Sequence, residues 1–123
     1  MRMWNVDVTK MCRQHLLAEH YEMHMFVGAI LKGKSISGYL EKGLVELHQI
    51  PLRHFQLITE MARRGYRHKS DLLPQEIWES VISQFPDKGK VDKELSVRTL
   101  CKRCLECRSA FLSEPPTTSG AGV

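Results

Sequence analysis

The stretch HLLAEHYEMHMFVGAIL, residues 15–31, decides the fold because it is the longest continuous helical pattern in the chain. Apolar residues stand at most of its positions, and helical side chains advance by about 100° per residue, so this helix is apolar on nearly every side. Such a helix is central to its fold. We predict that it begins at Thr9 or Lys10 and ends at Leu31, before the glycine at position 33.

The polar residues of this stretch fall on two sides of the predicted helix. His15, Glu19 and Glu22 lie within a sector of about 60°. His20 and His24 point to the other side. The five side chains therefore divide into two sets that do not converge on one point.

Glu19 and Glu22 need an explanation, because burial disfavours the charged form of a carboxylate that has neither a partner nor a function. One interpretation is structural: the two glutamates form ion pairs with arginines such as Arg2 or Arg63. The other interpretation is that Glu22 acts chemically. Helical phase alone leaves both open.

A metal site is a third interpretation of the same residues. His15 with Glu19, or His20 with His24, could bind an ion together, but the two pairs lie on different faces and the HExxH pattern is absent. The three cysteines of CKRCLEC, residues 101–107, lie on one continuous predicted helix with no fixed fourth ligand nearby in sequence. We interpret them as small core residues and predict no metal.

The rest of the chain predicts further helices and no strand, and hence an all-α protein of three main helices and a short one, with the N-terminus packed near the first helix. Pro51 suits the first turn of a second helix that ends at Arg64, before a glycine. Its expected buried side is Leu52, Phe55, Ile58, Met61 and Ala62. A short helix starts at Pro74 and is terminated by Pro86, and Asp92 caps a last helix over residues 93–112.

Composition favours one compact domain over residues 1–112 with a disordered tail at 113–123. The net charge of +4 and pI near 9.0 suit an anionic partner. No apolar run is long enough to span a bilayer and no signal peptide is recognisable, so we expect a cytoplasmic, intracellular protein without a membrane partner. We expect reduced thiols, because the four cysteines lack the dispersed spacing of a disulfide framework.

The order Gln14-His15-Leu16, Ala18-Glu19, Glu22 and Gly28-Ala29 resembles the first helix of the bacteriophage pyrimidine-dimer DNA glycosylase/AP lyase family, the UV-repair endonucleases. The matches share one ungapped register and cover about the first thirty residues. In that register Arg2 falls on an arginine of the family, and Glu22 falls on its catalytic glutamate.

The resemblance implies an enzyme that uses its N-terminal α-amine as nucleophile and needs no cofactor. The register places Met1 on the reacting residue, and Glu22 would stabilise the cationic sugar and move protons. An α-amine suits this role because α-amines titrate at about 7.7–8.0 and lysines at about 10.4. Glu19 and Tyr21 are expected to support the site.

The resemblance further implies double-stranded DNA as partner of a monomeric enzyme. The expected DNA-binding residues are Arg2, Arg13, Gln14, His15, Lys32, Lys34, Arg63, Arg64, Arg67 and Lys69. His15 could instead orient Glu22, and the basic cluster at 63–69 could be a solvated helix end. The family's phosphate-binding arginines are replaced by Tyr21 and Met25, which keeps a non-catalytic DNA-binding module open as the alternative.

Overall fold

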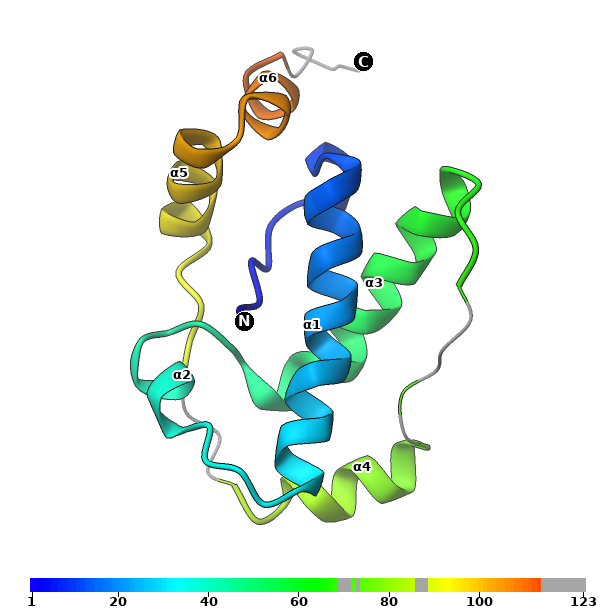
Figure 1. Ribbon diagram of the computed structural model, residues 1–123, viewed down its shortest axis with the longest axis vertical. Coiled ribbons are helices and arrows are strands. Elements are labelled where there is room, and N and C mark those ends of the chain that lie inside the picture. Colours follow the sequence, from blue (N-terminus) through cyan, green and yellow to red (C-terminus); the bar gives the residue numbers. More distant parts are fainter. Residues whose placement is uncertain (69–71, 73, 86–88, 114–123) are drawn as a thin grey trace, which may run out of the picture.

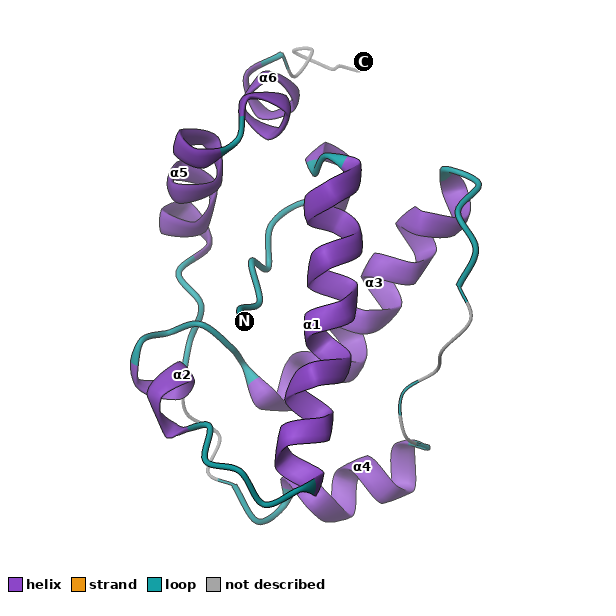
Figure 2. Cartoon of the chain, viewed as in Figure 1, coloured by secondary structure: helices purple, strands orange, loops and turns teal. Residues whose placement is uncertain are grey.

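The computed structural model describes residues 1–68, 72, 74–85 and 89–113. Within these residues, the regular secondary structure consists of helices alone (Figures 1 and 2). The α-helices are α1 (Arg13–Leu31), α2 (Ser37–Glu41), α3 (Ile50–Arg63), α4 (Gln75–Ile82), α5 (Lys93–Arg103) and α6 (Leu105–Leu112). Two 3-10 turns, η1 (Val8–Lys10) and η2 (Leu47–Gln49), precede α1 and α3. The all-α prediction is confirmed. Within the described part of the chain, no helix is both long and apolar enough to cross a bilayer.

The central element is α1, as its apolar pattern predicts (Figure 1). It begins at Arg13, later than the predicted start, because the Cys12 side chain caps it by accepting a hydrogen bond from the backbone N–H of His15. The residues before Cys12 form the separate turn η1. The end at Leu31 is confirmed, and Gly33 follows with a φ of 73°, a left-handed conformation that glycine adopts without strain.

The amino-terminal segment runs alongside α1 (Figure 1). Met3, Trp4 and Val6 are buried in the core. The backbone N–H of Met3 also donates to the carbonyl of Leu44 over 2.6 Å, which fixes the segment on its far side. The prediction that the N-terminus packs near the first helix is therefore confirmed.

Helix α3 packs across α1 and has a proline in its first turn, as predicted. It ends at Arg63, one residue before the predicted end, with Arg64 as its C-cap and Gly65 following at a φ of 84°. The predicted buried face was wrong in part, because Leu52 is 53% exposed and Phe55 is 62% exposed. The buried residues are Ile50, Arg53, His54, Leu57, Glu60 and Met61. Their helical spacing is regular, but half of them are polar, which the apolar pattern could not indicate. Arg53 and His54 have partners on α1, and Glu60 pairs with Arg63 and Arg64 at the end of α3.

The predicted continuous helix over residues 93–112 is wrong, because the chain breaks at Cys104. Cys104 has an extended backbone, with φ −135° and ψ 116°, and it ends α5 and caps α6 through a hydrogen bond from the N–H of Cys107. Asp92 caps α5 as predicted. The break turns α6 back toward η1 (Figure 1).

The other predicted elements are close to those observed. Helix α4 follows Pro74 as predicted, and Pro86 lies outside the described residues. Between α1 and α3 the chain also forms the short helix α2, which was not among the predicted helices. Of the predicted disordered tail at 113–123, the structure describes only Ser113, at the end of α6.

Candidate active site

Glu22 of α1 lies half-buried beside the amino-terminal segment. Its Oε1 accepts a hydrogen bond from the backbone N–H of Arg2 over 2.6 Å. Because consecutive backbone nitrogens are at most about 3.7 Å apart, the α-amine of Met1 lies within about 6–7 Å of this carboxylate. The fold thus brings together the two residues, Met1 and Glu22, that the sequence singled out as a catalytic pair.

A groove of about 580 Å³ opens beside Met1. This volume suits a small organic ligand and could accommodate a nucleobase with its sugar. Its walls include Met1, Tyr21, Met25, Lys32, Lys34 and Tyr39. A second hollow of about 490 Å³ is not lined by Met1, and Glu22 is a lining residue of neither hollow. Of these two hollows, the groove is the one that lies against the amino-terminal residue.

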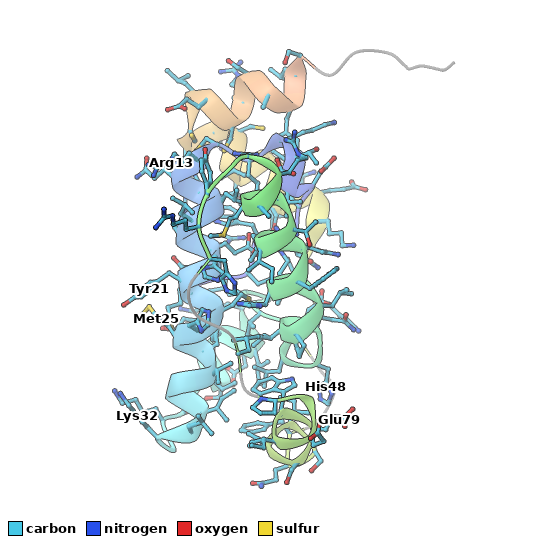
Figure 3. All side chains as sticks on the ribbon, turned by 90° about the vertical axis from the view of Figure 1, so that its right-hand side faces the viewer. Arg13, Tyr21, Met25, Lys32, His48 and Glu79 are labelled. Carbon is cyan, nitrogen blue, oxygen red and sulfur yellow. The ribbon has the colours of Figure 1, made fainter. Side chains whose placement is uncertain are left out.

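One side of α1 carries exposed residues along its length. Figure 3 shows Arg13, Tyr21, Met25 and Lys32 projecting from the same edge of the helix, and all four are exposed. Tyr21, expected to support the site, is 64% exposed at the mouth of the groove. The guanidinium of Arg13 lies 5.2 Å from the ring centre of Tyr66, a cation–π distance. Along this edge the cations Arg13 and Lys32 lie at the two ends, and Tyr21 and Met25 lie between them.

Arg2 lies against the protein rather than out in solvent. Its guanidinium lies over the Trp4 ring, 3.8 Å from the ring centre, and its Nη2 donates to Ser96 Oγ of α5 over 3.4 Å. Burial lowers the pKa of Arg2, as does the nearby charge of Arg103, while Glu19 and Glu22 act in the opposite direction. The side chain expected to contact DNA therefore also adds positive charge close to Glu22.

Glu19 forms a buried ion pair with Arg53 of α3, not with Arg2 or Arg63. Arg53 Nε and Nη2 donate to the two carboxylate oxygens of Glu19 over 2.6 and 2.9 Å. Arg53 Nη1 also donates to the carbonyl of Val6 over 2.8 Å. Both charged side chains are almost completely buried. Sequence reasoning missed Arg53; its only signal is its place in the helical spacing of the buried face of α3.

The basic cluster after α3 is divided between structure and surface. Arg64 Nε donates to Glu60 over 2.7 Å, and its Nη2 donates to the carbonyls of Val8 and Met11 over 3.1 and 2.7 Å. Arg63 also pairs with Glu60, yet its side chain is 63% exposed. The hydrogen bonds from Arg63 and Arg64 hold the pKa of Glu60 below its usual value, and the one from Arg63 has the larger effect. Arg67 is exposed, and Lys69 lies outside the described residues.

The structure places His15 among cysteines instead of beside Glu22. Its Nδ1 lies 3.2 Å from Cys12 Sγ and 3.8 Å from Cys107 Sγ. Cys104 completes a group whose four ligand atoms all lie within 4.8 Å of one another. Gln14, its neighbour on α1, is exposed.

The two other histidines of the opening stretch meet two histidines from farther along the chain. His20 and His24 of α1 lie with His54 of α3 and with His68, and their four ligand nitrogens also lie within 4.8 Å of one another. Burial, together with the neighbouring imidazoles of His54, His24 and His68, lowers the pKa of His20 to about 4. This side chain is therefore neutral at pH 7.

Both groups consist of residue types that can hold a metal ion. The break at Cys104 removes the reason for which the cysteines were predicted to have no fourth ligand, since it brings Cys104 and Cys107 to Cys12 and His15. Burial raises the pKa of Cys107 to about 12, whereas the backbone N–H of Cys107 lowers that of Cys104. Sequence reasoning did not find either group because each joins segments far apart in the chain.

A family model described as pyrimidine dimer DNA glycosylase matches residues 1–74. The match includes Met1, Glu22, the groove and the buried ion pair, and stops before α4. No curated protein and no solved structure matches the chain.

Proposed function

The chain belongs to the pyrimidine dimer DNA glycosylase family, and on that premise we propose that it removes a damaged, pyrimidine-dimer-like or otherwise modified base and then cleaves the strand as an AP lyase. The observation that carries this proposal is the hydrogen bond from the Arg2 amide to Glu22, which keeps the carboxylate beside the amino terminus. Met1 itself lines the groove. Substrate DNA accords with the family and with the net charge of +4.

In the proposed reaction the neutral α-amine of Met1 attacks C1′ of the damaged nucleotide. The bond from C1′ to the base breaks, its electron pair leaves with the base, and the base takes up a proton. Ring opening and loss of a proton from the amine give a Schiff base. Removal of a C2′ proton then breaks the C3′–O bond and expels the 3′ phosphate, and hydrolysis frees the amine. None of these steps needs a cofactor.

Glu22 has two roles in this scheme. Its negative charge stabilises the cationic sugar while the base departs, and its oxygens carry protons during ring opening and elimination. Because one oxygen is held by the Arg2 amide, the carboxylate keeps its position without help from the substrate. Arg2 is the adjacent cation, and we propose that its charge favours a phosphate next to the reacting sugar.

Exposed residues supply the remaining DNA contacts in our proposal, and two of them, Lys32 and Lys34, line the groove. Arg13, Lys32, Lys34, Arg63 and Arg67 are exposed cations that can bind phosphates, and Gln14 is an exposed hydrogen-bonding side chain next to Arg13 on α1. Tyr21 at the groove mouth can stack on an exposed base. We assign Arg64 and His15 structural roles instead, because their polar atoms contact Glu60 and the cysteines respectively.

Borohydride trapping tests the proposal. Borohydride added to the full-length protein with duplex DNA bearing an abasic site should reduce the Schiff base to a stable covalent adduct. Glu22→Gln should abolish strand cleavage, whereas Glu41→Gln, at an exposed position outside the groove, should leave it unchanged. One residue added ahead of Met1 should prevent the adduct.

Peptide mass spectrometry of the adduct identifies the amine. An adduct on Met1 supports the proposal; an adduct on a lysine, or one unaffected by the added residue, overturns it. A panel of dimer, alkylated, hypermodified and abasic duplexes identifies the substrate. DNA binding without cleavage across that panel, unchanged in Glu22→Gln, would instead establish the non-catalytic DNA-binding module that Tyr21 and Met25 motivate.

A further inference from the structure

We propose that Cys12, His15, Cys104 and Cys107 bind one zinc ion that ties α6 to the start of α1. These residues form two pairs of identical spacing, Cys12-X-X-His15 and Cys104-X-X-Cys107. The pairs stand at the first turns of two helices and face each other across the fold. Nothing in the proposed glycosylase chemistry uses them.

The distances between the four ligand atoms fit a tetrahedral zinc site. With Zn–S bonds of about 2.3 Å and Zn–N bonds of about 2.0–2.1 Å, neighbouring sulfurs are about 3.8 Å apart and a sulfur and a nitrogen about 3.5 Å apart. Cys12 Sγ lies 3.8 Å from Cys104 Sγ, and His15 Nδ1 lies 3.2 Å from Cys12 Sγ and 3.8 Å from Cys107 Sγ. The side chains therefore need only small adjustments to surround an ion.

Backbone N–H groups point at all three sulfurs. Cys12 Sγ accepts from the N–H of His15, Cys104 Sγ from that of Cys107, and Cys107 Sγ from that of Cys12 over 3.2 Å. Such hydrogen bonds stabilise thiolates, which are the form that binds zinc, and the helix N-termini add favourable partial charge. Zinc binding releases the three thiol protons and takes up the imidazole in its neutral form. Three sulfurs and one imidazole are a donor set characteristic of structural zinc.

This zinc site would hold the carboxyl-terminal helices against the active-site segment. Cys12 and Cys107 are buried where α6 meets the chain before α1. Helix α5, joined to α6 at Cys104, supplies the Ser96 hydroxyl that contacts Arg2. The ion would thus act at a distance from Glu22 by fixing the elements that position Arg2.

Elemental analysis of the full-length protein, purified without a histidine tag, tests this site. Of the four cysteines, Cys101 alone is outside the group, which makes Cys101→Ser the matched control. The zinc content of Cys104→Ser and of Cys107→Ser should each be lower by about one ion per chain than that of Cys101→Ser, which should equal the wild-type content. Circular dichroism of each variant shows whether it has folded.

Cobalt(II) titration of the wild-type protein, stripped of metal under reducing conditions, gives a readout independent of the variants. Tetrahedral thiolate coordination gives intense visible and charge-transfer bands that saturate at about one ion per chain. Equal metal content in Cys101→Ser and Cys104→Ser would overturn the proposal. So would a metal-free native protein whose Cys12 and Cys104 are joined in a disulfide.

The four histidines form a second site on independent evidence, and we infer that it binds a divalent transition-metal ion such as zinc. His54 Nε2 lies 3.2 Å from Nε2 of His20 and 3.2 Å from that of His24. Tetrahedral Zn–N bonds of about 2.0–2.1 Å would place the nitrogens about 3.3 Å apart. His20 and His24 are one turn apart on α1, and His54 and His68 approach them from α3 and the segment after it.

His48 is the one histidine outside both groups, so His48→Gln is the matched control for this site. Wild-type protein should carry about two zinc ions per chain, and His54→Gln should lose one of them without loss of the thiolate–cobalt bands. If His54→Gln and His48→Gln carry equal metal, the histidine site is refuted while the cysteine site stands. A wild-type metal content of about one, removed entirely by Cys104→Ser, would refute it equally.

Discussion

Glu19 and Glu22 are one helical turn apart, and we predict that one stabilises the fold while the other serves the reaction. Glu19 accepts two hydrogen bonds from Arg53, and both side chains are almost completely buried. Glu22 is half-buried and accepts one hydrogen bond from the Arg2 amide. The same chemical change, glutamate to glutamine, should therefore have opposite effects on stability and activity at the two positions.

Glu19→Gln leaves the Arg53 guanidinium buried without its counter-charge. Removing one partner of such a pair destabilises proteins by about 3–5 kcal/mol. For a chain of 123 residues, each kcal/mol lowers Tm by roughly 3–5 °C, so we expect Tm to fall by roughly 10–20 °C. Glu22→Gln weakens one half-buried hydrogen bond, a loss of at most about 1.5 kcal/mol, and should lower Tm by no more than about 8 °C.

The assay is a thermal melt followed by circular dichroism, paired with borohydride trapping well below each Tm. Glu19→Gln should still form the adduct, and Glu22→Gln should not complete strand cleavage. As a control for the buried charge, Glu19→Met combined with Arg53→Met removes both charges at similar volume and should recover much of the lost stability. A Tm for Glu19→Gln within about 3 °C of the wild type, or a double variant no more stable than Glu19→Gln, would refute this account of the core.

Three further perturbations separate other features of the structure. Leu57→Ala, at a fully buried position, should lower the free energy of unfolding by about 2–5 kcal/mol in a denaturant melt. Phe55→Ser, at a side chain that is 62% exposed, should change that free energy by no more than about 0.5 kcal/mol. The reverse order would mean that the apolar pattern of α3 was right and its observed orientation wrong. The folded-state pKa of Glu60 is lowered, so its ion pairs stabilise the protein fully above the unfolded pKa of about 4.3 and lose that effect as the pH falls through the folded pKa. Glu60→Gln should therefore flatten the acid side of a curve of Tm against pH. An unchanged curve would contradict the pairing with Arg63 and Arg64. Replacing Lys32 and Lys34 together by alanine should weaken DNA binding and reduce the slope of log K against log salt by about 1.8, measured by fluorescence anisotropy; an unchanged slope would place the DNA elsewhere.

The position of Arg2 connects the proposed zinc site with the active site. Its guanidinium lies over the Trp4 ring and reaches the Ser96 hydroxyl of α5, while its backbone N–H donates to Glu22. If the cysteine site holds α5 and α6 in place, metal removal should disturb Arg2 before it disturbs the packing of α1 on α3. Different interactions therefore stabilise the two sides of α1. The Glu19–Arg53 ion pair joins α1 to α3, and the proposed zinc ion joins it to α6.

The sequence alone was sufficient where local physical chemistry decides the structure. The continuous apolar pattern predicts α1 and its central place, and Gly33, Pro51 and Gly65 mark helix termini because each has a backbone preference that acts within one turn. The pairing of Glu22 with the amino terminus followed from a resemblance confined to about thirty residues, and the segment does run back along α1.

Only the tertiary structure decided which distant residues meet. Arg53 reaches Glu19 across 34 positions of sequence, and Cys104 reaches Cys12 across 92. Helical periodicity reports which face of a helix is apolar, but it carries no information on the partner that a buried charge or thiol selects. The partner is selected by the free energy of removing both groups from water together. That free energy is set only when the helices have packed and the two groups are buried side by side. The break at Cys104 belongs to the same class, because the extended backbone that ends α5 accompanies a contact with the far end of the chain.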